Sequence, residues 1–305
     1  MFQDYFLGGN TALGFYSLYA GFPHRADAFL HILKGGPGTG KSTLLRAIAR
    51  EADRHGLEVQ RVLCSGDPDS LDGVYLPALG LAWVDGTAPH LIEPELFGAN
   101  GDYVNLGAFF ARPFSQAEKS QLLALQAAYK DCYRRAYALL AECPRDSETT
   151  QRCSDEQLRD VLAALPVQEK PGHRSRRFAS AITCKGLLHL PLASEDYTVL
   201  RAPAVALPAG AEEVQRRGWD VILCPSPLFP DEAEALLLPE KKLAFTAVPD
   251  SEQADQPYLE KAVEALREAK ALHDELEALY RPHMDFPGLS AYAGQLLEKL
   301  FPPKE

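Results

Sequence analysis

Several features are scarce in this sequence, and each scarcity argues against a class of protein. No stretch approaches 18 consecutive apolar residues, so no membrane-spanning helix is predicted. Residues 1–6 lack the basic start and apolar run of a secretory signal, which favours a cytoplasmic protein. The six cysteines form no CxxC pair, so a zinc site of that kind has little support, and we interpret the thiols as reduced packing residues.

Basic residues are also scarce relative to acidic ones. The chain has 31 Lys and Arg against 42 Asp and Glu, a net charge of −11. Such a surface repels DNA, RNA and anionic lipid, so no stable nucleic-acid or membrane binding is expected. With 305 residues, of which 46% are hydrophobic, the chain is long enough for one large domain or two of ordinary size.

One segment is far more informative than the rest. Residues 35–43 read Gly-Gly-Pro-Gly-Thr-Gly-Lys-Ser-Thr and satisfy GxxxxGK[ST], the phosphate-binding loop (P-loop). Residues 29–33 are a short apolar run typical of a buried parallel strand, and residues 42–52 carry apolar side chains at helical spacing. Strand, glycine-rich loop and helix is the order that this motif requires.

The residue types in the loop predict nucleotide binding. Glycines let the chain turn tightly and direct main-chain N–H groups at phosphate oxygens, and the helix N-terminus favours the anion. We expect Lys41 to reach the β- and γ-phosphates, the Ser42 hydroxyl to bind Mg²⁺, and Thr43 to support the loop or the α-phosphate. The residues predicted to contact the nucleotide are Gly35, Gly36, Pro37, Gly38, Thr39, Gly40, Lys41, Ser42 and Thr43.

A nucleotide site also needs an acidic partner for the metal. Residues 81–85 are four apolar residues followed by Asp85, which is the Walker B pattern, and we assign Asp85 to Mg²⁺ and to catalysis. Gly86 stands where many ATPases carry the glutamate that activates water. No Asn-Lys-x-Asp sequence occurs, so guanine recognition is unsupported and ATP is favoured.

A second acidic residue competes for the catalytic roles. Asp67 lies in the acidic loop 65–72, which follows a predicted strand over 59–64 at the edge where open α/β sheets bind ligands. Asp67 would hold a metal-bound water or act as the base; the alternative is a plain turn rich in Asp, Pro and Ser. The base therefore stays open between Asp67, Asp85 and Glu93.

The rest of the chain predicts two α/β units. Long helices are expected over 116–141 and from about 257 to 280, and a short helix over 155–165. Residues 167–175 are rich in Pro and Gly and basic, which is typical of a linker. The predicted division is a P-loop domain over 1–166, a linker over 167–175 and a second α/β domain over 176–305.

The two halves resemble each other. The similar pairs of segments are 56–64 with 218–224, 77–83 with 239–245, and 15–17 with 178–180. We interpret this as a diverged duplication of one α/β unit. Residues 197–210 occupy the place of the second phosphate loop but lack its glycine cluster, its Lys and its Ser/Thr. The second half is therefore predicted to bind no triphosphate and to serve a structural or regulatory role.

Taken together, these motifs resemble an uncharacterised family of prokaryotic P-loop ATPases built as two tandem units. The resemblance covers nearly the whole chain and rests on segments 9–17, 34–43, 64–73, 85–90, 105–107, 178–186 and 284–286. It implies a three-layer α/β/α P-loop NTPase fold with a mainly parallel sheet, duplicated, and here with a degenerate second unit. Relatives carry an intact second loop, so a mechanism that needs two ATP sites does not transfer.

The resemblance also draws attention to residues outside the loop. Asn10 and Thr11 would precede the first strand and approach the nucleotide, or Asn10 would cap a turn. His90 would sense the γ-phosphate or bond the main chain. A basic cluster opening the second half would supply an arginine finger or form a solvated linker face; it consists of Arg174, Arg176 and Arg177.

Three functions are compatible with these motifs. The leading one is an ATPase that hydrolyses Mg·ATP at the single loop over 35–43. The alternatives are a kinase for a nucleotide or small molecule, and an ATP-dependent switch or scaffold with little turnover of its own. Sites of this type are often completed by a neighbouring subunit, so a homodimer or an unidentified protein partner stays open.

Overall fold

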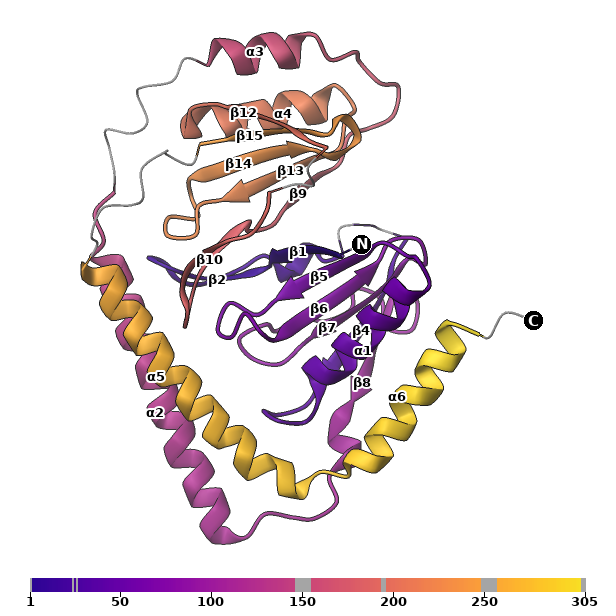
Figure 1. Ribbon diagram of the computed structural model, residues 1–305, viewed down its shortest axis with the longest axis vertical. Helices are drawn as coiled ribbons and strands as arrows, with labels where there is room; N and C mark the ends of the chain where they lie inside the picture. Colours follow the sequence, from indigo (N-terminus) through magenta and orange to yellow (C-terminus); the bar gives the residue numbers. More distant parts are fainter. Residues whose placement is uncertain are drawn as a thin grey trace.

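The computed structural model describes residues 2–23, 25, 27–145, 155–192, 196–247 and 257–302. It shows a mixed α/β protein with two larger sheets, two small hairpins and six α-helices within that part of the chain (Figure 1). No helix in the described segments is both long and apolar enough to cross a membrane.

The first sheet contains the strand that precedes the glycine-rich loop. Its order is β1-β5-β6-β7-β4-β8, and every strand except β6 runs in the same direction. The strands are β1 (Phe2–Phe6), β4 (Phe29–Lys34), β5 (Val59–Leu63), β6 (Leu71–Leu76), β7 (Leu81–Asp85) and β8 (Gly101–Asn105). The carboxyl ends of β4, β5 and β7 therefore meet the start of β6 at one edge, which is where α/β sheets bind ligands.

The second sheet repeats this arrangement. Its order is β9-β13-β14-β15-β12, and every strand except β14 runs in the same direction. The strands are β9 (Arg174–Arg176), β12 (Thr198–Arg201), β13 (Val221–Pro225), β14 (Ala233–Leu238) and β15 (Leu243–Thr246). Each sheet also has a hairpin, β2 (Gly8–Thr11) with β3 (Gly14–Ser17) and β10 (Ser180–Thr183) with β11 (Gly186–His189).

The helices are α1 (Lys41–Arg54), α2 (Gln116–Ala141), α3 (Glu156–Ala163), α4 (Leu207–Arg216), α5 (Pro257–Tyr280) and α6 (Phe286–Leu300). Four helices lie close to their predicted bounds, namely α1, α2, α3 and α5, whereas α4 and α6 had no predicted bounds. Ser115 starts α2 with a capping box, in which its side chain accepts from the Glu118 amide and Glu118 accepts from the Ser115 amide. Helices α2 and α5 lie side by side as a long arm beside the sheets (Figure 1).

The layering of the first sheet differs from the predicted α/β/α sandwich. Helices α1 and α6 cover one face, where alternate strand residues such as Leu33, Val74 and Trp83 are buried. The opposite face carries Leu30, Ile32 and their neighbours, and its cover is the β2–β3 hairpin with the short 3₁₀ turn η1 (Tyr19–Gly21). Within the described residues, the buried cluster on that face includes no residue of an α-helix.

The predicted domain division also differs from the packing. Helix α3, assigned to the first unit, buries Leu158 and Leu162 against α4 and the second sheet. Helix α6, assigned to the second unit, buries Leu289 against α1 and the first sheet. The predicted linker 167–175 also runs into β9, which begins at Arg174. The chain thus crosses between the two halves more than once. No single boundary in the sequence therefore divides it into the two packed units.

Candidate functional site

The glycine-rich loop lies between β4 and α1, as the motif predicts. Gly38 and Gly40 adopt positive φ angles of 66° and 91°, conformations that L side chains rarely adopt. The buried Thr39 hydroxyl donates to the Gly36 carbonyl at 2.8 Å and closes the loop on itself. Helix α1 begins directly after Gly40, so its free N–H groups face the loop.

Lys41 joins the loop to the neighbouring strand. Its Nζ donates to the carbonyls of Gly35 at 2.6 Å and Gly36 at 2.9 Å. The same Nζ lies 3.5 Å from Asp85 Oδ2, and both side chains are little exposed, at 12% and 13%. Asp85 Oδ1 accepts from the Thr87 amide and hydroxyl at 2.8 and 2.6 Å. Because β4 and β7 are adjacent parallel strands, the two predicted residues meet at one point.

Ser42 faces the same sheet edge. Its Oγ accepts from the Leu71 amide at 3.0 Å, which ties the first turn of α1 to the start of β6. Thr43 is exposed on the helix surface. The Ser42 hydroxyl and the Asp85 carboxylate are hard oxygen donors, the ligand type that Mg²⁺ prefers. The donor chemistry therefore fits the predicted ion.

Asp67 is engaged within its own loop. Its carboxylate accepts from the Asp69 amide at 3.2 Å and the Ser70 hydroxyl at 3.3 Å, and Lys270 of α5 lies 3.5 Å away. Asp69 in turn pairs at 2.6 Å with Lys185 in the β10–β11 turn. The acidic loop is thus held by cations from α5 and from the second half, which matches the alternative of a structural turn.

Glu93, the third candidate base, lies at the rim. Its Oε1 is 3.3 Å from Lys34 Nζ, and its Oε2 accepts from the Tyr103 hydroxyl. The Glu93 side chain is 66% exposed. Each of the three candidate carboxylates therefore already has partners.

Helix α5 covers the loop from outside, a contact that sequence reasoning missed. A Cβ at Gly38 would lie 2.9 Å from the Glu277 carbonyl oxygen and 3.0 Å from its Cα. A Cβ at Gly36 would lie 3.0 Å from the Tyr280 ring. The two glycines are therefore needed for α5 to approach as well as for the turn itself. No sequence motif signals this contact, because α5 lies near the opposite end of the chain.

The Glu277 carboxylate lies against the loop. A hydrogen bond from His273, the charges of His273 and Arg281, and the Gly38 main chain hold the pKa of Glu277 below its ordinary value. The Glu277 carboxylate, which pairs with His273 at 3.5 Å and with Arg281 at 3.4 Å, thus lies next to the loop that is expected to bind phosphate.

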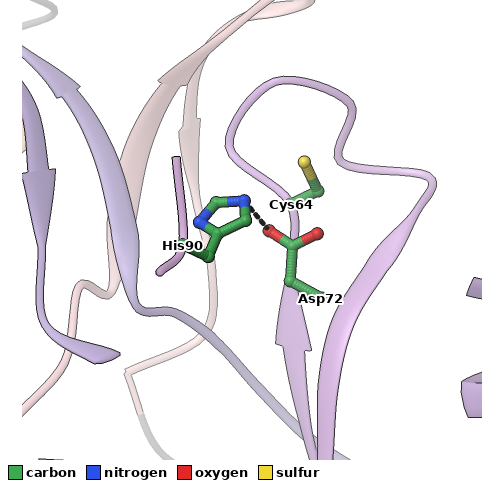
Figure 2. Close-up of side chains that lie close together, drawn as sticks. All are labelled: Cys64, Asp72 and His90. Atoms are coloured by element: carbon green, nitrogen blue, oxygen red, sulfur yellow. Dashed lines mark ion pairs between the residues drawn. The ribbon is translucent and has the colours of Figure 1, made fainter. Parts of the chain in front are cut away.

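A buried cluster lies at the same sheet edge. His90 Nε2 is 3.2 Å from Asp72 Oδ2, and the Tyr19 hydroxyl donates to that oxygen at 3.0 Å. Cys64 lies beside the same pair, and the three donor atoms of Cys64, Asp72 and His90 lie within 4.8 Å of one another (Figure 2). Asp72 and His90 are only 5% and 7% exposed.

The environment of this cluster disfavours negative charge. Burial, with the nearby Asp85 as a lesser cause, raises the pKa of Asp72, and the charge of His90 acts in the opposite direction. Burial and the neighbouring Asp72 raise the pKa of the Cys64 thiol well above its usual range. In the sequence, His90 stands out only through the resemblance and Cys64 is interpreted as a packing residue, since the three residues share no recognisable spacing.

Asn10 and Thr11 do not precede the first strand, as the sequence suggested; they lie in β2, which follows β1. Asn10 Nδ2 donates to the carbonyls of Ser65 at 3.1 Å and Ile182 at 2.9 Å, and its Oδ1 accepts from the Tyr137 hydroxyl. Thr11 closes its hairpin turn. Asn10 thus ties the acidic loop to the second half.

The basic cluster of the second half is also structural. Arg176 donates to the Tyr16 hydroxyl at 3.2 Å and lies over that ring. Arg177 is buried over a tyrosine ring of β1, and Arg174 lies 3.8 Å from Glu212. These arginines stand at the junction of the halves and in β9, away from the glycine-rich loop, so none is placed as an arginine finger.

Comparisons with models of protein families, with curated proteins and with solved structures give no match for this chain. Function is therefore inferred from the geometry of the site.

Proposed function

We propose that the chain binds Mg·ATP at residues 35–43 and hydrolyses it, as the resemblance to tandem P-loop ATPases implies. The observation that carries this proposal is the position of Lys41, which lies inside the loop and 3.5 Å from Asp85. A strand, a loop with two positive-φ glycines and a helix N-terminus converge there, as phosphate binding requires.

Each residue has a distinct role in the proposed reaction. Main-chain N–H groups of the loop and the Lys41 ammonium stabilise the charge that develops on the γ-phosphate oxygens. Ser42 and Asp85 would hold Mg²⁺, which supplies charge neutralisation of the phosphates when bound. Thr87 orients Asp85 through two hydrogen bonds to one oxygen.

The candidate bases favour slow turnover by the chain alone. Asp67 accepts hydrogen bonds within its loop, Asp85 holds Lys41 and Thr87, and Glu93 holds Lys34. To activate a water at the γ-phosphate, one of these carboxylates would therefore have to give up its present partners. This favours a chain whose hydrolysis is accelerated by a further protein or a second copy, and it is also compatible with the switch alternative.

One observation favours the kinase alternative. A cavity of about 320 Å³ lies beside α1, one turn beyond Ser42, and three arginines line it together with Asp4 and Asp69. Arg61 is paired with Asp4, Arg46 donates to the Asp69 carbonyl, and Arg50 is exposed on α1. Guanidinium groups bind phosphate well, so a phosphorylated acceptor is the substrate class that this cavity would take.

The test is phosphate release from Mg·ATP with parallel measurement of ATP binding. Lys41→Ala should lower release by roughly 100-fold or more, the loss typical when a charge-stabilising donor is removed. Lys170→Ala is the matched control, because Lys170 is exposed and pairs with Glu240 in the second half. Unchanged ATP affinity in folded Lys41→Ala would contradict the assignment of the loop.

The same experiment separates the alternatives. Lys41-dependent release by the chain alone supports the ATPase. ATP binding without release moves the proposal to a switch or a kinase. The kinase then requires transfer of labelled γ-phosphate to a phosphorylated small molecule, with loss of transfer in Arg50→Ala.

A further inference from the structure

Three segments bring different donor atoms to one buried point beside the glycine-rich loop. Cys64 follows the last residue of β5, Asp72 is the second residue of β6, and His90 lies in the turn after β7 (Figure 2). The Cys64 amide donates to the Ser70 carbonyl at 3.1 Å, and the His90 amide donates to the Thr87 carbonyl at 2.8 Å. Each donor thus stands on a fixed main chain rather than on a free loop.

A β-bulge directs Asp72 into this point. Val62 pairs with Gly73 and Leu63 with Leu71, so Asp72 is the extra residue of β6. Bulges of this kind turn a side chain out of the regular alternation of a strand. The Tyr19 hydroxyl then fixes the carboxylate by donating to Oδ2 at 3.0 Å.

We propose that Cys64, Asp72 and His90 bind one divalent transition-metal ion, with zinc as the best match. The set combines a thiolate sulfur, an imidazole nitrogen and a carboxylate oxygen, which are the ligands that zinc takes in proteins. Zinc bonds of about 2.0–2.3 Å place neighbouring ligand atoms of a tetrahedron roughly 3.3–3.7 Å apart. The 3.2 Å between His90 Nε2 and Asp72 Oδ2 is close to that spacing, and all three donors lie within 4.8 Å.

The donor set also separates this site from the predicted magnesium site. Mg²⁺ takes oxygen ligands in octahedral geometry and is poorly matched by a thiolate, whereas Ser42 and Asp85 offer oxygen alone. With three protein ligands, the fourth zinc position is left for water, the pattern of sites at which zinc activates a water molecule. Metal binding would release the Cys64 thiol proton to solvent and place positive charge beside Asp72 and Asp85.

This proposal does not rest on ATP binding, and its test contains no nucleotide. Co²⁺ is the probe, because a tetrahedral cobalt–thiolate site absorbs in the visible and shows a sulfur-to-metal charge-transfer band in the near ultraviolet. The purified chain, in a non-thiol reductant, is expected to bind one Co²⁺ with both signals and to lose them on addition of one Zn²⁺.

Variants identify the ligands. Cys64→Ser should abolish the charge-transfer band and weaken Zn²⁺ binding by more than roughly 100-fold, beyond the 10–100-fold typical of groups that only orient ligands. Cys132→Ser is the matched control, since Cys132 is a free thiol outside the cluster and contacts Arg135 instead. It should keep both signals.

A second variant covers the case in which Cys64→Ser does not fold. His90→Gln should retain the thiolate band with a shifted visible spectrum and weaker binding, because sulfur still binds the metal but nitrogen does not. Absence of a thiolate band in the wild type, or its persistence in folded Cys64→Ser, would overturn the proposal.

Discussion

Phe6 and Phe178 exchange both of their main-chain hydrogen bonds across the junction of the two halves. The Phe6 amide donates to the Phe178 carbonyl at 3.0 Å, and the Phe178 amide donates back at 2.8 Å. Phe6 ends the edge strand β1, Phe178 follows the edge strand β9, and each precedes a hairpin. Those hairpins close alike, with Thr11 bonded to the Gly14 carbonyl and Thr183 to the Gly186 carbonyl. Equivalent residues that pair with each other indicate an approximate two-fold relation.

The sheets extend this correspondence. In the first sheet the bulge leaves Asp72 as the extra residue, and in the second it leaves Glu234, because Cys224 pairs with Ala235 and Pro225 with Ala233. Both acidic residues are buried. We infer a duplication in which the first copy carries the glycine-rich loop, while the second has Ala-Pro-Ala-Val-Ala between β12 and α4.

The first prediction is that Phe178→Ala destabilises both halves together. Phe178 is fully buried and packs with Phe6 and Ala181, so its truncation should lower the free energy of unfolding by about 3–5 kcal/mol. The two tryptophans, Trp83 in the first half and Trp219 in the second, report the halves separately in Trp83→Phe and Trp219→Phe backgrounds.

Urea unfolding followed by each tryptophan should give coincident transitions that Phe178→Ala shifts equally. Phe97→Ala is the control, because Phe97 is 68% exposed and its loss should change stability by less than about 0.5 kcal/mol. Separate transitions in the wild type would show that the junction does not couple the halves.

Local features could be predicted well because local patterns determine them. The apolar run ending at Asp85 and the Pro/Gly-free stretch of α2 became elements with the predicted bounds. Two of the three predicted segment pairs fall on equivalent strands, β5 with β13 and β7 with β15, but the third is out of register: the sequence matches residues 15–17 with 178–180, whereas Phe178 corresponds to Phe6. Register depends on pairing between strands, and short diverged segments do not specify it.

Long-range packing could not be predicted for a related reason. The amphipathic pattern of helices α3 and α6 is compatible with packing on either sheet, and their positions depend on contacts with residues far away in the chain. The contact of Glu277 with the loop and the convergence of Cys64 with His90 likewise depend on how separate turns meet in space.

The second prediction concerns the two roles of Gly38. Its φ of 66° makes any L residue strained, and its Cβ would collide with the Glu277 main chain. Gly56 has a similar φ of 74° with open space around it, so Gly56→Ala measures the backbone strain alone, about 1–2 kcal/mol. Gly38→Ala should cost more than this and should also weaken ATP binding. If Gly38→Ala and Gly56→Ala lose equal stability, α5 moves aside for the added Cβ at no cost in free energy.

The third prediction is that Glu277→Gln tightens ATP binding. Glu277 packs against Gly38, so its negative charge should repel phosphate in the loop, and the amide keeps the shape without the charge. A decrease of Kd by roughly 3- to 10-fold, larger at low salt, corresponds to about 0.7–1.4 kcal/mol. Glu275→Gln, on the exposed side of α5, should leave Kd unchanged. Weaker binding in Glu277→Gln would mean that the carboxylate supports the loop instead.

The fourth prediction concerns Glu234, the counterpart of Asp72. Burial raises the pKa of Glu234 to about 8, with hydrogen bonds from Ser180 acting in the opposite direction, and its Oε1 has no partner among the described residues. Between pH 4.5 and 8 the folded chain holds a proton that the unfolded chain releases. The free energy of unfolding should therefore fall by roughly 1.4 kcal/mol for each pH unit in that window from this residue alone.

Glu234→Gln removes this dependence because its amide cannot ionise. The variant should match the wild type near pH 4.5 and become progressively more stable than it up to pH 8, as measured by urea unfolding across the series. Glu232→Gln is the control, since Glu232 is exposed and pairs with Arg145. If the difference between wild type and Glu234→Gln stays constant with pH, Glu234 carries the same charge in the folded and unfolded chain. Such a result would mean that water reaches the Glu234 carboxylate in the folded chain.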